Sequence, residues 1–121
     1  MKKVIIAGPR DFTDKELVWK ELDELLILYE RPITEDIVIF EGGAKGVDCL
    51  AHEYALENDY SVKQFPADWS LGKKAGPIRN EQMAKEADVL IAFYNGSKGT
   101  TSMIKLAMQY GLRIHIIPIK K

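Results

Sequence analysis

The stretch ADVLIAFYNGSKGTTSMIKLAMQYG, residues 87–111, places an apolar run, a glycine-rich loop and an amphipathic segment in direct succession. The run Asp88–Tyr94 predicts a buried β-strand, and the segment after Gly99 predicts a helix. Gly111 marks the end of that helix, because glycine readily adopts the left-handed conformation found just beyond helix ends. A strand, a short loop and a helix in this order predict an α/β fold.

Four further segments predict strands in the rest of the chain. Continuous apolar strands that alternate with helices are typical of a parallel sheet with both faces covered. The 121 residues suffice for one core but not for two. We therefore expect one domain over residues 1–121, a Rossmann-like three-layer α/β sandwich with a parallel five-stranded sheet and helices on both faces. The further strands are expected at Lys3–Gly8, Asp36–Glu41, Tyr60–Phe65 and Arg113–Ile119.

Helical spacing of apolar residues predicts more helices between these strands. At the start of the first helix, Thr13 with Glu16 predicts a capping box. Pro32 predicts the end of that helix, because proline cannot continue it. The helices are expected at about Asp14–Tyr29, from Val47 onward and at about Pro77–Glu86.

The composition excludes several classes of protein. Hydrophobic residues make up 46% of the chain and the formal net charge is −1, which excludes a disordered chain and gives no general reason to expect polyanion binding. The longest apolar run is far shorter than the roughly 20 residues of a membrane span. The apolar stretch near the N-terminus is also too short for a signal peptide.

The cysteine and histidine content indicates neither a disulfide nor a metal site. Cys49 is the single cysteine, which fits a reducing compartment. His52 and His115 lie far apart in the sequence, and their spacing matches no metal-binding motif. We therefore expect a cytoplasmic protein with no membrane partner, no metal and no cofactor.

Glycine-rich loops follow several predicted strands, at Gly8–Asp11, Gly42–Asp48 and Asn95–Thr101. In an α/β sheet these loops meet at the carboxyl edge, where ligands bind. Glycine lets backbone N–H groups approach a ligand closely, and the start of the following helix favours phosphate. Tight strand–helix turns are the alternative reason for the glycines, and neither GxxxxGK[ST] nor GxGxxG is present. The candidate ligand-binding residues in these loops are Gly8, Arg10, Gly42, Gly43, Ala44, Lys45, Asp48, Asn95, Gly96, Lys98, Gly99, Thr100 and Thr101.

A long connection, PADWSLGKKAG at residues 66–76, precedes the third helix. Trp69 within it is expected either to stack on a nucleobase or to pack as a lid on the sheet edge. Arg79 and Asn80 lie in the first turns of that helix, where arginine can hold a phosphate with its guanidinium fork and asparagine can bind a sugar or a base. A solvated surface position is the alternative for Arg79.

Several motifs, taken in order, resemble a known family. They are GPRDFTD, EGGAKGVD, FPADW, GKKAGPIRNEQM, ADVLIAF and NGSKGTTSMIKLA, and they span nearly the whole chain except the region between Leu17 and Ile37. They resemble the YspA-like branch of the SLOG superfamily, Rossmann-like domains related to the DNA-processing protein Smf/DprA and to the LOG cytokinin-activating phosphoribohydrolases. The resemblance implies a site for a nucleotide or nucleotide-derived ligand at the strand ends, lined by Gly42, Gly43, Asp48, Arg79, Asn80, Gly96, Gly99 and Thr100.

The chain departs from the LOG enzymes at their catalytic loop. Those enzymes carry PGGxGT followed by glutamates on the next helix, whereas Ser102 and Met103 hold the glutamate positions here. Cleavage of an N-glycosidic bond usually needs a carboxylate that stabilises the oxocarbenium-like state or activates water. The resemblance therefore implies a loop that binds a ligand without the LOG acid, with Arg79 in the place of the LOG arginine.

Three functions remain open at this point. The first is a binding module that senses or sequesters a nucleotide-like small molecule. The second is a hydrolase or transferase acting on a nucleotide N-glycosidic or phosphate bond, with Asp11, Asp48 and Asp68 as candidate catalytic acids. The third, single-stranded DNA binding, is disfavoured by the near-neutral charge and the scarcity of well-placed aromatic residues. We also expect a homo-oligomer, with the last helix and the surface around Trp19 and Leu28 as apolar contact areas.

Overall fold

The computed structural model describes residues 1–29 and 36–120 and contains one sheet of five strands. The strand order is β3-β2-β1-β4-β5, and every neighbouring pair is parallel. This is a Rossmann-like α/β fold, as the sequence predicts. The strands are β1 (Lys2–Ala7), β2 (Ile37–Glu41), β3 (Ser61–Gln64), β4 (Val89–Tyr94) and β5 (Arg113–Pro118).

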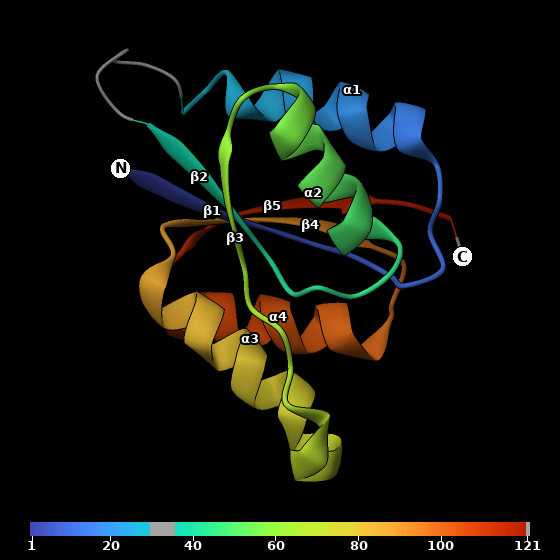
Figure 1. Cartoon of the computed structure of the whole chain (residues 1–121), viewed down its shortest axis with the longest axis vertical. Coiled ribbons are helices and arrows are strands. Elements are labelled where there is room, and N and C mark those ends of the chain that lie inside the picture. Colours follow the sequence, from blue (N-terminus) through green and yellow to red (C-terminus); the bar gives the residue numbers. More distant parts are fainter. Residues whose placement is uncertain (30–35, 121) are drawn as a thin grey trace.

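Helices cover both faces of the sheet (Figure 1). The first two, α1 and α2, lie on one face, and α3 and α4 lie on the other. A short 3₁₀ segment, η1, precedes α3 and extends beyond it at the bottom of Figure 1. The bounds are α1 (Lys15–Leu26), α2 (Val47–Glu57), η1 (Trp69–Lys74), α3 (Ala75–Glu86) and α4 (Lys98–Gln109).

The core forms two layers, one on each side of the sheet, because successive side chains of a strand point to opposite faces. In β1, Val4 and Ile6 pack with residues of α1 and α2, whereas Ile5 packs with Met83 of α3 and Met103 of α4. All three of these β1 side chains are fully buried. Burial on both faces explains why the inner strands are unbroken apolar runs in the sequence.

The start of α1 differs from the sequence prediction. Asp14 is the N-cap residue, and its Oδ1 accepts a hydrogen bond from the backbone N–H of Leu17 at 3.1 Å. The predicted capping box of Thr13 and Glu16 is therefore wrong by one residue. Aspartate caps a helix at least as well as threonine, so the shorter helix loses nothing by starting there. The helix ends at Leu26, three residues before the predicted end at Tyr29, and Pro32 lies outside the described residues.

The starts of α3 and α4 also lie earlier than predicted. The first of these helices begins at Ala75 and not at Pro77, and the second begins at Lys98 and not after Gly99. Proline is accepted at the third position because the first N–H groups of a helix have no intrahelical partner. As a result Gly76 and Gly99 each lie in the first turn of a helix, where the sequence had placed them in loops.

The strand order creates a switch point beside β1. The chain passes from β1 outward to β2 and β3, and then crosses to β4 and β5 on the other side. The loops after β1 and β4 lead to helices on opposite faces, which leaves a crevice between them at the carboxyl ends of the strands. No helix within the described ranges is long and apolar enough to cross a membrane.

Candidate functional site

A cavity of about 710 Å³ lies at the switch point, where β1 and β4 end. Its walls come from the loops after β1, β2 and β4, from η1 and from the first turns of α3 and α4. We call it the site cavity. Its volume is in the range of small-molecule binding sites in proteins.

The start of α4 is the feature of the site cavity best suited to an anion. Lys98, Gly99 and Thr100 line the cavity, and their backbone amides have no hydrogen-bond partner among the described residues. Ser97, the N-cap residue, makes no side-chain capping bond, because its hydroxyl donates to Oγ1 of Thr100 at 2.8 Å. Unpaired amides and the positive end of the helix dipole together favour a negatively charged ligand group.

Two glycines keep space open in the site cavity. A Cβ atom added to Gly76 or to Gly99 would meet no atom within 4 Å, and neither residue has a positive φ. Neither the backbone conformation nor close packing therefore requires glycine at these helical positions, where glycine costs about 0.5–1 kcal/mol of stability relative to alanine. Both residues line the cavity, so the space in front of them is available to a ligand.

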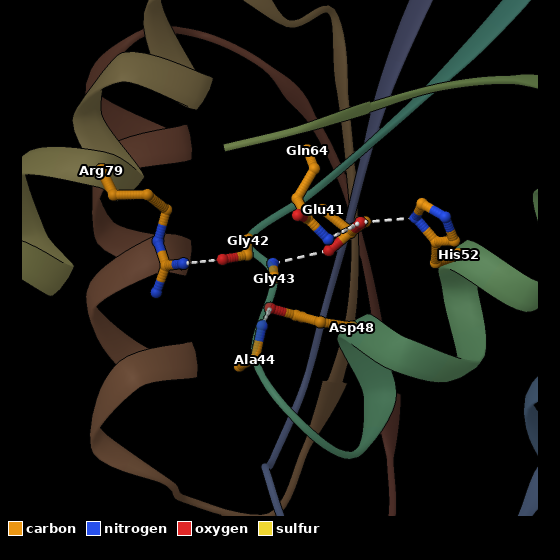
Figure 2. A network of polar contacts seen from close by, with 8 residues as sticks. All are labelled: Glu41, Gly42, Gly43, Ala44, Asp48, His52, Gln64 and Arg79. Carbon is orange, nitrogen blue, oxygen red and sulfur yellow. Dashed lines mark hydrogen bonds and ion pairs between the residues drawn. The ribbon is translucent and has the colours of Figure 1, made fainter. Parts of the chain in front are cut away.

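Arg79 reaches the site from the second turn of α3. Its Nη1 donates to the carbonyl oxygen of Gly42 (Figure 2). The same nitrogen donates to the Phe65 carbonyl at 3.4 Å, and Nε donates to Oδ1 of Asn80 at 2.9 Å. Burial lowers the pKa of Arg79, while the nearby Asp48 carboxyl raises it. These bonds fix the guanidinium against the loop after β2, and Arg79 lines the site cavity from there.

Asp48 is the buried acid of the site cavity. Its Oδ2 accepts a hydrogen bond from the Ala44 amide at 3.2 Å, and its side chain lines the cavity from the first turn of α2. Burial raises the pKa of Asp48 from 3.8 to about 6, although the Ala44 amide and the Arg79 charge oppose this shift. A carboxyl group with such a pKa can hold or release a proton near neutral pH.

The raised pKa of Asp48 predicts a pH-dependent free energy of unfolding. The unfolded chain releases this proton near pH 3.8 and the folded chain near pH 6. The folded state therefore binds more protons between these values, and its stability falls as the pH rises through this window. The total contribution is of the order of 2–3 kcal/mol. We expect urea unfolding from pH 4 to pH 7 to show that the free energy of unfolding of Asp48→Asn increases relative to that of the parent as the pH rises. A difference between the two proteins that does not change with pH would contradict the effect of burial on Asp48.

Trp69 and Arg10 lie together at the mouth of the site cavity. Trp69 is 60% exposed, and Cζ of Arg10 lies 5.7 Å from the centre of its indole ring. Arg10 comes from the loop after β1, and Trp69 is the first residue of η1. The indole is thus not packed on the sheet edge as a closed lid, and one of its faces is beside a cation.

The most buried polar group of the described chain, Glu41, was not predicted as a site residue. It is fully buried at the end of β2, where Oε1 accepts from the Gly43 amide at 2.5 Å and Oε2 from Gln64 Nε2 at 2.9 Å. Nδ1 of His52 lies 2.8 Å from Oε2. Figure 2 shows this network on the side of the loop away from Arg79. A charged residue that ends an apolar strand directly before two glycines is the sequence signal that could have found it.

The site cavity brings together most of the sequence-predicted residues. Lys73, Gly76 and Ser102 also line it and were not predicted as ligand contacts. They carry no motif of their own, and only the folded position of η1 and the two helix starts reveals them. The predicted residues that line the cavity are Gly8, Arg10, Asp11, Ala44, Asp48, Trp69, Arg79, Asn80, Lys98, Gly99 and Thr100.

Other predicted residues serve the loops themselves and do not line the site cavity. Oδ1 of Asn95 accepts from the amide of Ser97 at 3.2 Å, and the hydroxyl of Thr101 donates to the Ser97 carbonyl at 2.8 Å. Oδ1 of Asp68 accepts from the amide of Ser70 at 3.2 Å and so caps η1. These side chains shape the two loops that hold the cavity residues.

The glycines after β2 also have local structural roles. Gly42 is buried, and a Cβ added there would clash with the guanidinium of Arg79. Gly43 has φ +78° and its amide donates to Glu41, so that amide is not free for a ligand. Lys45 is exposed outside the cavity, and Gly96 lines a neighbouring groove between α3 and α4.

Comparison with solved structures shows the same fold. DNA processing protein A (DprA) from Streptococcus pneumoniae matches with a TM-score of 0.76 and 20% identity, over 99% of this chain and 51% of that one. This chain thus spans about half the length of the DprA chain. The structural genomics target TM1055 matches with a TM-score of 0.64 and 23% identity, over 94% of this chain and 72% of that one.

Two sequence comparisons identify the family. The Gene 61 protein of Mycobacterium phage D29 is 36% identical over 123 aligned positions, and the match spans 94% of each chain. The sequence profile of YAcAr, the YspA, cpYpsA-related SLOG family, matches residues 2–72. With more than half of its length matched by this profile, the chain belongs to the YspA, cpYpsA-related SLOG family.

Proposed function

We propose that the chain binds a nucleotide or nucleotide-derived anionic ligand in the site cavity and acts as a sensor or sequestering module. One observation carries this proposal: Lys98, Gly99 and Thr100, whose backbone amides have no partner in the described part of the chain, line a cavity of about 710 Å³ that Arg79 also lines. A phosphate at the start of α4 would receive several charge-assisted hydrogen bonds, which are roughly twice as strong as neutral ones.

The charges around the site cavity support an anionic ligand. Four cationic residues line it, Arg10, Lys73, Arg79 and Lys98, against two acids, the exposed Asp11 and the buried Asp48 near Arg79. Because the pKa of Asp48 is raised to about 6, slightly acidic conditions neutralise this acid and leave the cavity more positive. The charge balance of the cavity thus differs from the near-neutral charge of the whole chain.

A flat aromatic group would fit the mouth of the site cavity. The exposed ring of Trp69 provides a stacking surface there, and the guanidinium of Arg10 lies close enough to stack on the same base. Asn80 is buried and already bonded, since its Oδ1 accepts from Arg79 and its Nδ2 donates to the Gly99 carbonyl at 3.4 Å. We therefore assign Asn80 to positioning and Trp69 to base stacking.

Titration calorimetry with a panel of nucleoside mono-, di- and triphosphates tests the proposal. We expect affinity for the nucleotides and much weaker affinity for the corresponding nucleosides, because the phosphate supplies the contacts at α4. Mass spectrometry of small molecules that co-purify with the protein would identify the base. Equal affinity for a nucleoside and its phosphates would exclude the phosphate site at α4.

Arg79→Ala should weaken nucleotide binding by at least about tenfold, since a hydrogen bond to a charged group contributes about 1.5–3 kcal/mol. Arg79→Lys should restore only part of the affinity, because an ammonium lacks the guanidinium fork. Lys20→Ala is the matched control, since Lys20 is exposed on α1 across the sheet. Calorimetry with the tightest ligand of the panel measures all three variants, and parent-like affinity of Arg79→Ala would exclude Arg79 as a contact.

A hydrolase acting on a nucleotide is the second candidate, and the raised pKa of Asp48 favours it. Ser102 and Met103 offer no carboxylate at the positions of the LOG glutamates, and Met103 is 1% exposed. A missing general acid or base removes about 10²–10⁴ in rate, so we expect little release of free base from nucleoside monophosphates. Chromatographic assay of base release by the parent and Asp48→Asn checks this. Robust turnover that disappears in Asp48→Asn would establish the enzyme in place of the binding module.

A further inference from the structure

A groove of about 540 Å³ between α3 and α4 adjoins the site cavity. Pro77, Lys98 and Ser102 line both hollows, so the two share a wall made by the first turns of the two helices. The groove continues along α4 as far as Gln109. A ligand bound at the start of α4 can therefore extend over this wall into the groove without leaving the protein surface.

Two cationic residues of α4, Lys98 and Lys105, line the groove. Lys98 and Lys105 are seven positions apart on α4, which places them on one face at roughly 10 Å along the helix axis. Both are exposed, and neither forms an ion pair with another described residue. Glu81, the acid of the groove, lies 4.0 Å from Nζ of Lys85 and accepts from the Tyr110 hydroxyl at 3.1 Å. The charges left unmatched in the groove are therefore positive.

The groove also has an apolar wall. Ile78 of α3 is 42% exposed, and Leu106 of α4 lines the groove opposite it. A phosphate alone would make no use of these side chains, whereas a sugar or base carried by the phosphate would cover them. The volume is by itself in the range of small-molecule sites, so it has room for a second unit as well as a linking group.

We propose that this groove is a second subsite and that the ligand is a dinucleotide, two nucleoside units joined through phosphate. The inference rests on the proposed function, which places the first nucleotide in the site cavity with its phosphate at the start of α4. The linking phosphate passes Lys98, which lines both hollows. The second unit then lies along α4, with the phosphate oxygens on its side of the link directed towards Lys105 and its sugar or base over Ile78 and Leu106.

Calorimetry with matched ligands tests the second subsite. Each 5′-mononucleotide is compared with two dinucleotides of the same base, one with a 3′–5′ phosphodiester link and one with a 5′–5′ polyphosphate link. We expect one of the two dinucleotides to bind at least about tenfold more tightly than the mononucleotide, and the preferred link identifies the ligand class. Lys105→Ala should lower the affinity for that dinucleotide by about fivefold, as expected for an exposed ion pair, and leave the mononucleotide affinity unchanged.

Further variants separate a specific contact from general charge. Lys105→Arg should keep the affinity, Lys105→Glu should lower it further than alanine does, and Lys20→Ala on α1 should change nothing. Equal affinity for mononucleotide and dinucleotides, or an equal loss for both with Lys105→Ala, would overturn the second subsite. So would self-association, measured by sedimentation, that Lys105→Glu abolishes, because it would show that a second copy occupies the groove.

The test also separates this inference from the proposed function. If mononucleotides bind and Arg79→Ala weakens them, but no dinucleotide binds more tightly, the second subsite fails and the proposed function stands. If no nucleotide of any kind binds the parent protein, both fail together.

Discussion

Gly99→Val is expected to reduce nucleotide affinity at least about hundredfold while the protein stays folded. A side chain at this position would extend into open space, because no atom lies within 4 Å of a Cβ added there. It would cover the amides of Gly99 and Thr100, which have no partner within the described structure. Two charge-assisted hydrogen bonds at about 1.5–3 kcal/mol each account for this loss. Calorimetry measures the affinity and thermal unfolding confirms the fold.

The variants Gly99→Ala and Gly111→Ala should change the stability of the protein in opposite directions. Gly99→Ala should weaken binding yet raise stability by up to about 1 kcal/mol, because helical glycine is unfavourable. Gly111→Ala should lower stability by about 1–2 kcal/mol, because Gly111 has φ +73°, and should leave the affinity unchanged. Parent-like affinity of Gly99→Val would contradict the anion site at α4.

Glu41→Ala is expected to lower the free energy of unfolding by about 2–4 kcal/mol. The carboxyl group is fully buried and bonds to Gly43, His52 and Gln64. Its removal leaves these donors without their acceptor and leaves a cavity under the loop after β2. Such a loss is a large part of the 5–15 kcal/mol that typically stabilises a domain. Urea unfolding at pH 7 measures it.

Glu53→Ala is the matched control for Glu41. Glu53 is exposed on α2 and should change stability by no more than about 0.5 kcal/mol. Glu41→Gln keeps the shape of the side chain but turns one acceptor into a donor, so its effect should lie between those of the two alanine variants. A loss in Glu41→Ala no larger than that in Glu53→Ala would show that the buried network adds no stability.

The fold could be predicted from the sequence because each element carries a signal of its own. The run Val89–Phe93 is apolar throughout, since both faces of β4 are buried, and this pattern predicts a central parallel strand. The first residues of the helices could not be predicted from the sequence with the same accuracy. Ala75 and Gly76 show no helical periodicity. Pro77 follows them, and because proline is common at the first helical position, the sequence places the helix start there.

The site could be predicted only in part, because sequence gives positions and not contacts. The sequence indicates Gly99 as a candidate because it follows a strand, and Arg79 because it lies in the first turns of a helix. Gly43 met the same criteria, yet its amide is occupied by Glu41. That pairing depends on the direction of one buried side chain at the end of β2, which no spacing rule describes. Gly76 enters the cavity only through the position of η1 and α3.

The central place of β1 has a consequence for the chain as it is synthesised. β1 pairs with β2 on one side and with β4 on the other, where the amide of Lys3 donates to Oδ2 of Asp88, 85 residues further along. A growing chain therefore completes β1, β2 and β3 while one edge of β1 is still open. An open apolar strand edge can pair with another chain, and contacts so distant in sequence form slowly. Nascent chains that end before Val89 should accordingly be the species most prone to aggregation and most in need of a chaperone.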